Sequence, residues 1–412
     1  MYMKIAELEN KRILIMGYGM EGKATEEFLR AKVPSAVIGI ADRHDDPDYL
    51  SKQDSYDLVI KTPSLHKSKL HVPYTTATNI FFANVKNMII GITGSKGKST
   101  TTSLIYSILK EAGMKATIKG NIGIPMISEL LRPIDEDEVF VLELSSYQLD
   151  DIHYSPHIAV VTSLFPEHMN FHGSIEAYYE AKHQIIRYQT EADMFVYNQK
   201  FDLLCEWAKQ SRSMSVPYIE DDISDWERVL KGEHNLDNIH AAVTVARQMN
   251  ISDEISERAV AKFEPLAHRL EYAGTYKGIQ FINDALATTP EATMQALRAY
   301  PDVTTIMLGG EDRGYDFSDL VDMLGTTNIQ TIIIFPESGQ TMMRMIKEKY
   351  GERYSFFETT SMEDAVKHAY EQTKQGATCL LSTASPSYSI WKNYVEKGNL
   401  FKEYVLRYGG EV

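Results

Sequence analysis

The sequence predicts an α/β protein of three domains whose sheets are mostly parallel. Short apolar runs alternate with amphipathic, helix-like segments along the whole chain. Glycine-rich loops follow two of these apolar runs, and each loop opens the next helix-like segment. We place the domains at residues 1–87, 88–265 and 266–412, because the loop and strand pattern restarts at each boundary.

Composition restricts the class of partner. The chain has 412 residues, a net charge of −15 and only two cysteines. The negative charge argues against nucleic acid as a partner, and two cysteines provide neither a metal-binding spacing nor a disulfide framework. The N-terminal segment lacks the apolar core of a signal peptide, and no apolar run reaches 18 residues. We therefore expect a cytoplasmic monomer without a nucleic-acid or membrane partner.

The first domain opens on a glycine turn. Arg12–Met16 is the expected first strand, and residues 17–22 form a G-x-G-x-x-G turn into a helix. The second strand, 36–41, is followed by an acidic residue at the spacing typical of a dinucleotide-binding unit. A tight turn that binds nothing is the alternative. The pattern predicts a Rossmann-like domain with candidate binding residues Gly17, Gly19, Gly22, Asp42 and Arg43.

The second glycine-rich loop follows the apolar pair Ile89-Ile90 and reads TGSKGKSTT. A strand, a Gly-Lys-Ser loop and a helix form a phosphate cradle, in which Lys98 reaches the terminal phosphates and Ser99 or Thr100 binds Mg²⁺. The loop is tighter than G-x-x-x-x-G-K-[ST], because Ile92 occupies the place of the first glycine. We predict a central ATPase domain of the P-loop type, with phosphate-loop residues Gly94, Ser95, Lys96, Gly97, Lys98, Ser99 and Thr100.

The remaining elements follow from periodicity and capping. A helix is expected to start at Pro290 with Thr289 as its cap. Other helices are expected at 174–189 and from Asn235. Further strands are expected at 139–144, 158–163, 279–283, 304–308, 331–335 and 377–381.

Several polar residues follow expected strands or open helices. Glu143 ends a buried-type strand beside the phosphate loop, where a carboxylate suits Mg²⁺; a solvent-facing carboxylate is the alternative. His168 follows the next strand, where a structural or solvent-facing histidine is the alternative. Lys182 lies on a helix, where a solvated lysine is the alternative. Asn235 and Asn238 crowd a helix start, where N-capping is the alternative.

The third domain adds further candidates. Arg269 lies at the boundary with the second domain, where an arginine could reach a γ-phosphate on domain closure; a surface salt bridge is the alternative. Asp284 ends a strand, and Arg313 lies in the loop after another strand.

Taken together, these segments resemble the Mur ligases, the ATP-dependent amide ligases of peptidoglycan precursor synthesis. The similar segments are TGSKGKSTT, LELSSYQL, SLFPEHMNFHGSIEAYYEAK, GEHNLDNIHAA and HRLE, in this order along the chain. The glycine turn, GNIG at 120–123, LGGEDRGYDF and STASPSYSIWKNYVEKGNLF resemble the glutamate-adding members in particular. The resemblance runs from end to end.

The resemblance implies ATP-dependent joining of glutamate to UDP-N-acetylmuramoyl-L-alanine through an acyl phosphate. It implies ATP and two Mg²⁺ ions as cofactors, held by Lys98, Ser99, Glu143, His168 and a carbamylated Lys182. It places Asn235, Asn238, Arg269 and Asp284 around ATP. It places the UDP substrate at the glycine turn, Asp42, Arg43, Thr62 and Asn121, and glutamate at Thr288, Arg313, Ser387, Tyr388 and Tyr394.

The sequence departs from the family pattern at several positions. Lys96 stands where the family usually has Asn, and Glu167 and Asn170 replace the two Asp of a D-H-x-D motif. Leu286 stands where a lysine is expected, and Ser389 where an Asp is common. The last two departures fall near the amino-acid site. We expect D-glutamate as substrate, with L-glutamate as the alternative.

Three other functions fit parts of the sequence. A dehydrogenase rests on residues 17–22 alone and leaves the Lys98 loop without a role. A ligase similar to folylpolyglutamate synthase shares the ATP core, but such enzymes lack a glycine-rich block ahead of the ATP loop. A non-catalytic regulator is supported by Lys96, Asn170 and Leu286, whereas the intact Lys98, Glu143, His168 and Lys182 oppose it.

Overall fold

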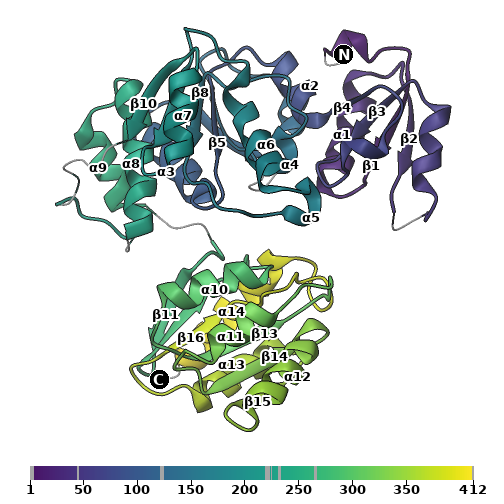
Figure 1. Ribbon diagram of the computed structural model, residues 1–412. Helices are drawn as coiled ribbons and strands as arrows, with labels where there is room; N and C mark the ends of the chain where they lie inside the picture. Colours follow the sequence, from purple (N-terminus) through teal and green to yellow (C-terminus); the bar gives the residue numbers. More distant parts are fainter. Residues whose placement is uncertain are drawn as a thin grey trace. The chain divides into compact units, whose positions relative to one another are not determined.

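The computed structural model describes residues 4–43, 46–120, 125–218, 223, 225–230, 233–263 and 267–410. The chain divides into two compact units, Met1–Glu264 and Pro265–Val412. Within the described residues, three sheets account for the strands, two in the first unit and one in the second (Figure 1). Each unit is described by itself below.

The first sheet has the strand order β2-β1-β3-β4, and all of its pairs are parallel. Its strands are β1 (Arg12–Met16), β2 (Val37–Ala41), β3 (Leu58–Lys61) and β4 (Tyr74–Thr76). The helices α1 (Met20–Lys32) and α2 (Ala77–Asn84) accompany it. Because all strands run the same way, the loops after β1, β2 and β3 meet at one edge of the sheet.

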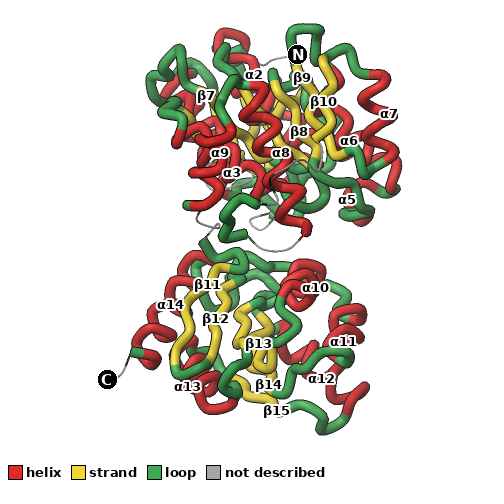
Figure 2. Tube along the Cα trace, turned by 90° about the vertical axis from the view of Figure 1, so that its left-hand side faces the viewer, coloured by secondary structure: helices red, strands yellow, loops and turns green. Residues whose placement is uncertain are grey.

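The second sheet has the order β10-β9-β8-β5-β7-β6 and is also fully parallel. Its strands are β5 (Ile89–Thr93), β6 (Ala116–Gly120), β7 (Val139–Glu143), β8 (Ile158–Val161), β9 (Met194–Asn198) and β10 (Met214–Tyr218). Figure 2 shows these strands between two layers of helices. One layer holds α3 (Lys98–Glu111), α8 (Glu233–Gln248) and α9 (Asp253–Ala261); the other holds α6 (Ile175–Arg187) and α7 (Asp202–Gln210). The short helices α4 (Ser146–Leu149) and α5 (Met169–His172) precede α6.

Side chains alternate between the two faces of this sheet, as the two-residue period of a strand requires. Ile90 and Ile92 pack against α3 and α8, whereas Ile89 packs in the opposite core. That opposite core also contains Phe28 of α1 and Ile80 of α2. The first two sheets therefore share one continuous hydrophobic core, which explains why residues up to 264 form a single unit.

The third sheet has the order β11-β12-β16-β13-β14-β15. Its strands are β11 (Glu271–Tyr276), β12 (Ile279–Asn283), β13 (Val303–Gly309), β14 (Thr331–Phe335), β15 (Ser355–Glu358) and β16 (Thr378–Leu381). Only β11 is antiparallel, and it joins β12 through Lys277 and Gly278, both at positive φ. Two such residues form the tight turn that suits a twisted hairpin. The helices are α10 (Pro290–Ala299), α11 (Ser318–Leu324), α12 (Ser338–Tyr350), α13 (Met362–Gln372) and α14 (Tyr394–Gly409).

The predicted elements are present with small shifts at their ends. The strands expected at Arg12–Met16, Ile279–Asn283 and Thr331–Phe335 have these same limits in the structure. Thr289 caps α10 as expected, since its hydroxyl accepts a hydrogen bond from the Ala292 amide. The helix expected from Asn235 begins two residues earlier. The sequence analysis did not predict seven of the described strands: β3, β4, β6, β9, β10, β11 and β15. The half-buried residues of β11, for example, show no clear apolar alternation.

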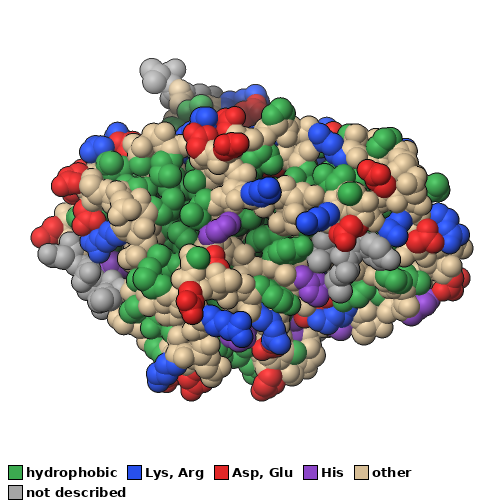
Figure 3. Space-filling view, turned by 90° about the horizontal axis from the view of Figure 1, so that it is seen from above, with side chains coloured by type: hydrophobic (Ala, Val, Ile, Leu, Met, Phe, Trp, Pro, Cys, Tyr) green, Lys and Arg blue, Asp and Glu red, His purple; other side chains and the backbone are tan. Residues whose placement is uncertain are grey.

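No helix within the described residues is both long enough and apolar enough to span a bilayer. The face drawn in Figure 3 carries acidic and basic side chains next to one another, rather than one broad area of a single sign.

Candidate active site

The phosphate loop connects β5 to α3 and is held in one conformation by glycines at positive φ. Gly94 has φ +150° and Gly97 has φ +86°. A Cβ at Gly94 would lie 2.0 Å from Thr162 Oγ1, and one at Gly97 would lie 2.3 Å from Asn238 Oδ1. Only glycine fits both positions. The loop therefore presents its backbone and the N-terminal end of α3 at the carboxyl edge of the sheet, as an anion-binding loop does.

Lys98 begins α3 and lies over this loop. Its Nζ donates hydrogen bonds to the carbonyl oxygens of Gly94, at 2.8 Å, and of Ser95, at 2.9 Å. The Ser95 hydroxyl in turn contacts the backbone of Phe165 and the Tyr178 hydroxyl. These bonds fix the loop against the segment that follows β8.

Lys182 projects from α6 beneath the phosphate loop, and its side chain is buried. Its Nζ donates to the carbonyl oxygen of Gly94 at 2.8 Å and lies 4.8 Å from the centre of the Tyr178 ring. Burial, together with the nearby charge of Lys98, lowers the pKa of Lys182 well below its ordinary value. The alternative of a solvated helix lysine is therefore wrong.

His168 caps α5 and lies on the same side of the sheet as Lys182. Its ring centre is 5.1 Å from that of Tyr147 and 6.0 Å from that of Tyr178. Burial lowers the pKa of His168; the charge of Glu167 acts against this shift, and the charges of Lys98 and Lys182 add to it. A neutral imidazole is the form that binds a metal ion.

Glu143 and Asn238 complete the arrangement around the loop. Glu143 is buried at the end of β7 and pairs in register with Ile92 of the neighbouring β5. Asn238 Oδ1 accepts a hydrogen bond of 3.3 Å from Thr101 of α3, and its Nδ2 donates to Asn235 at 3.2 Å. The structure thus places the central-domain candidates around one loop.

Tyr178 was not identified from the sequence, although it touches three of the candidates. It lies one helical turn before Lys182, so both side chains project from the same face of α6. This spacing is the pattern by which the sequence could have indicated it.

The glycine turn of the first sheet also meets its predicted partners. Gly17 has φ +94°, and a Cβ there would lie 2.0 Å from Thr62 Oγ1, so the ends of β1 and β3 touch. The Tyr18 amide donates to Asp42 at the end of β2. Arg43 is exposed, and Asn121 lies outside the described residues. Glu21, which the sequence did not suggest, places one buried carboxylate oxygen beside this turn.

In the second unit, Asp284 follows β12 and is deeply buried. Its carboxylate accepts hydrogen bonds from the Leu270 amide, at 3.2 Å, and the Ser382 hydroxyl, at 2.7 Å. Burial raises the pKa of Asp284 to about 7, although Ser382 and the charge of Arg269 act against this shift.

Four of the residues predicted to bind glutamate lie in loops after three neighbouring parallel strands, β12, β16 and β13, and the fifth, Tyr394, begins α14. Arg313 lies with its guanidinium 5.8 Å from the Tyr388 ring centre, and its Nε donates to Glu311. The Ser387 hydroxyl is buried and has no hydrogen-bond partner within the described chain. Thr288 is half-buried, and the Tyr394 ring lies 6.1 Å from His268.

Leu286 occupies the position at which a lysine was expected. A different lysine, on α14, is buried near the neighbouring residue Ala287. Lys397 is fully buried, and its Nζ donates to the Thr383 hydroxyl, whose oxygen lies 3.4 Å from the carbonyl of Ala287. Burial lowers the pKa of Lys397 to about 7. Ser389, the other departure, donates to the carbonyl of Pro336.

The described residues contain no group of three or more His, Cys, Asp or Glu side chains arranged to hold a metal ion. The predicted Mg²⁺ ligands include only two such side chains, Glu143 and His168. The others are the Ser99 hydroxyl and Lys182, which offers an oxygen only after carbamylation.

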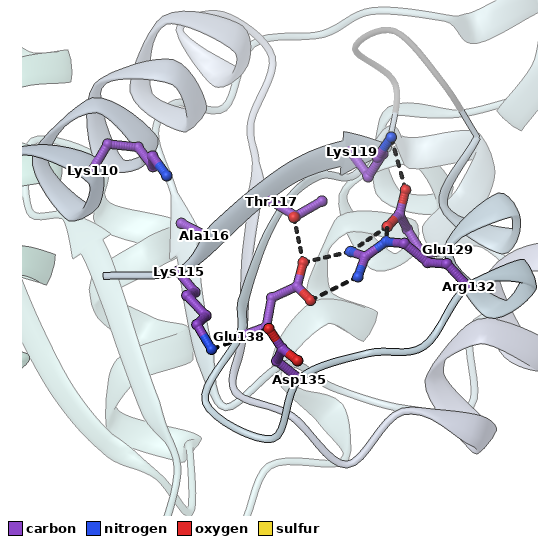
Figure 4. A pocket seen from close by; sticks show the side chains of 9 residues that line it. All are labelled: Lys110, Lys115, Ala116, Thr117, Lys119, Glu129, Arg132, Asp135 and Glu138. Carbon is purple, nitrogen blue, oxygen red and sulfur yellow. Dashed lines mark hydrogen bonds and ion pairs between the residues drawn. The ribbon is translucent and has the colours of Figure 1, made fainter. Parts of the chain in front are cut away.

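A separate pocket of about 470 Å³ lies beside the edge strand β6 (Figure 4). Its acidic side chains are already paired: Glu129 with Lys119 and Arg132, Glu138 with Arg132, and Asp135 with Lys115. None of the predicted site residues lines it. The lining residues are Lys110, Lys115, Ala116, Thr117, Lys119, Glu129, Arg132, Asp135 and Glu138.

Comparison with known proteins identifies two domains and relatives along the whole chain. Residues 92–228 match the Mur ligase middle domain, and residues 268–385 match the Mur ligase glutamate ligase domain. The chain is 32% identical to UDP-N-acetylmuramoylalanine–D-glutamate ligase of Oenococcus oeni, over 96% of this chain and 97% of that protein. It is 30% identical to the Streptococcus agalactiae ligase of the same name, with the same coverage.

Among solved structures, MurF ligase from Thermotoga maritima in complex with ADP has the same fold. The TM-score is 0.61 at 16% identity, covering 98% of this chain and 97% of that one. The end-to-end similarity to the D-glutamate ligases, together with the two matched domains, shows that this chain belongs to the Mur ligase family.

Proposed function

We propose that this protein is an ATP-dependent amide ligase that joins D-glutamate to UDP-N-acetylmuramoyl-L-alanine in peptidoglycan precursor synthesis. The observation that carries this proposal is the phosphate loop, with Lys98 above it and Lys182 and His168 beside it. A carboxylate is a poor acyl donor, so ATP first phosphorylates the terminal carboxylate of the UDP substrate and ADP is released. The amine of glutamate then attacks this acyl phosphate, the amide bond forms, and phosphate leaves.

The residues around the loop have the chemistry that transfer of the terminal phosphate requires. Lys98 neutralises charge on the terminal phosphates, and the N-terminal end of α3 faces them. Asn235 and Asn238 lie beside the loop and would bind ATP on the adenine side. Arg269 and Asp284 would approach ATP from the second unit when the domains close.

The donor set fits Mg²⁺ once Lys182 is carbamylated. Bound Mg²⁺ would supply positive charge that draws electrons from the phosphate oxygens. Ser99 and Glu143 would hold one ion, and His168 and the Lys182 carbamate would hold a second. An amine reacts with CO₂ only when it is neutral, and the buried environment of Lys182 favours the neutral form.

The two substrates would bind at loops beyond strand ends. The UDP part would lie at the glycine turn of the first sheet, with Asp42, Arg43, Thr62 and Asn121. Glutamate would lie in the second unit, where Arg313 can bind two carboxylate oxygens at once and the Ser387 hydroxyl is buried without a partner. Thr288, Tyr388 and Tyr394 would line the same site.

L-glutamate is the second candidate substrate, and Leu286 supports it. The lysine expected at this position is absent, while Lys397 introduces a buried amine from a different direction. An amine at Lys397 instead of at position 286 would suit L-glutamate, because its α-carboxylate and side chain occupy exchanged positions relative to those of D-glutamate.

The test is ADP formation by the purified protein with ATP, Mg²⁺ and UDP-N-acetylmuramoyl-L-alanine, comparing D-glutamate, L-glutamate and other amino acids. We expect turnover to be highest with D-glutamate and to fall by a factor on the order of 10² or more in Lys98→Ala. Turnover independent of Lys98 would contradict the role of the phosphate loop, and faster turnover with L-glutamate would reverse the choice of enantiomer only.

A further inference from the structure

An ion pair joins two of the residues at which this sequence departs from the Mur ligase pattern. Lys96 Nζ lies 2.5 Å from Glu167 Oε1. Lys96 stands where Asn is usual, and Glu167 where Asp is usual, so both side chains are longer here. The two departures are therefore complementary in charge and in reach.

The pair connects the phosphate loop to the part of the chain that carries His168. Neutral hydrogen bonds already fix the nearer part of that segment: the Ser95 amide donates to Ser163, and the Phe165 amide donates to Ser95. Beyond Phe165, which is 48% exposed, the chain turns outward to His168. The Lys96 side chain extends from the phosphate loop to this outer part and forms its ion pair with Glu167 there.

The position of His168 needs such support. Its backbone has φ +58°, in the left-handed region that non-glycine residues rarely adopt, and its side chain is 44% exposed. The Lys96 and Glu167 side chains are 39% and 18% exposed. The pair is therefore partly shielded from solvent and is screened less than a fully exposed one.

We propose that Lys96 and Glu167 act as one positioning pair that holds His168 at the correct distance from the phosphate loop for Mg²⁺-dependent nucleotide binding. The inference rests on the proposed function, which places ATP and Mg²⁺ at this loop. Neither residue needs to touch the ligand. Their effect reaches His168 through the backbone that joins it to Glu167 and through the Glu167 carboxylate, whose Oε2 lies 3.9 Å from His168 Nε2.

The test is a double-mutant cycle with Lys96→Met, Glu167→Gln and the double variant. The affinity for ADP is measured by calorimetry twice, with Mg²⁺ and with EDTA. We expect each single variant to weaken Mg²⁺-dependent binding about fivefold, and the double variant to weaken it about fivefold rather than 25-fold, because the second change has no pair left to break. Binding in EDTA should change less than about twofold.

A matched control is the ion pair between Arg258 and Glu111, at 2.9 Å, with side chains 52% and 26% exposed. Glu111 lies at the opposite end of α3 from Lys98, about 20 Å away at 1.5 Å per residue. The Arg258→Met/Glu111→Gln variant should bind ADP as the parent does, with and without Mg²⁺.

Three outcomes would overturn the inference. Additive effects in the double variant would mean that the two residues act separately. Equal losses in Mg²⁺ and in EDTA would mean that Lys96 binds the nucleotide itself. Unchanged binding in both single variants would leave the pair without a functional role. Since the cycle uses ADP alone, it does not depend on the identity of the amino-acid substrate, and failure to ligate glutamate would count against the proposed function only.

Discussion

Lys182 Nζ donates a hydrogen bond of 2.8 Å to the carbonyl oxygen of Gly94, within the phosphate loop. A lysine on α6 is thus held directly beneath the loop that begins α3. Burial and the charge of Lys98 favour the neutral amine, which is the form that reacts with CO₂. Lys182 is therefore the residue at which the proposed binding of Mg²⁺ by a lysine carbamate can best be tested.

Lys182→Ala should be nearly inactive, because the carbamate oxygens that would bind Mg²⁺ are lost. Added acetate or formate should restore part of the activity by replacing those oxygens. ¹³C NMR of the parent in ¹³C-bicarbonate should show a carbamate resonance that is absent from the variant. Lys209→Ala, which removes an exposed lysine from α7, is the control. A fully active Lys182→Ala variant would contradict the assignment.

Gly97→Ala should weaken nucleotide binding at least about tenfold, because the new Cβ must displace Asn238. Gly113→Ala is the matched control. Gly113 also has positive φ, at +75°, but a Cβ there meets open space. Both variants should lose about 1–2 kcal/mol of stability from backbone strain alone. Titration with ADP checks the difference, and equal binding by the two variants would show that the contact with Asn238 has no importance.

Arg313→Ala should raise the apparent KM for glutamate far more than that for ATP. The variant lacks the guanidinium that would bind two oxygens of a glutamate carboxylate. Arg344→Ala, an exposed arginine on α12, should leave both constants unchanged. Initial rates at varied glutamate and varied ATP separate the two effects. Equal increases for both substrates would remove Arg313 from the glutamate site.

Glu21→Gln should flatten the pH dependence of stability. Burial raises the pKa of Glu21 from 4.5 to about 7, although the charge of Lys61 and a hydrogen bond from Gln148 oppose the shift. Between these values the folded protein retains a proton that the unfolded chain has lost, so stability falls as pH rises from about 4.5 to 7.

The parent should therefore lose up to about 3 kcal/mol more than Glu21→Gln between pH 5 and pH 8. Urea unfolding of the first unit at both pH values measures this difference. Glu27→Gln, on the exposed side of the same helix, should behave as the parent does. A parallel pH profile for the parent and Glu21→Gln would show that Glu21 is ionised throughout.

Local pattern was enough to predict nine of the sixteen described strands and the loops that follow several of them. The limits of β1, β12 and β14 agree with the sequence, because each is an apolar run bounded by glycine, asparagine or proline near its end. The loops that carry Gly17, Lys98 and Asp284 could be placed in the same way, because each directly follows an expected strand and the carboxyl ends of parallel strands meet at one edge of a sheet.

The side-chain partners could not be predicted in this way. The sequence marked Lys96 and Glu167 as separate departures, and only the adjacency of β5 and β8 brings them within 2.5 Å. Tyr178 and Lys397 were missed because an aromatic residue or a lysine on an amphipathic helix has the same local pattern whether it supports a site or not.

The sequence by itself determined the α/β class, the alternation of strands and helices, and the glycine loops, because these depend on propensities and spacings within a few residues. The tertiary structure decided that the first two sheets share one core, that β11 turns back on β12, and that Lys182 is buried beneath Gly94. These features depend on strand order and on packing between segments far apart in the chain, which local patterns do not encode.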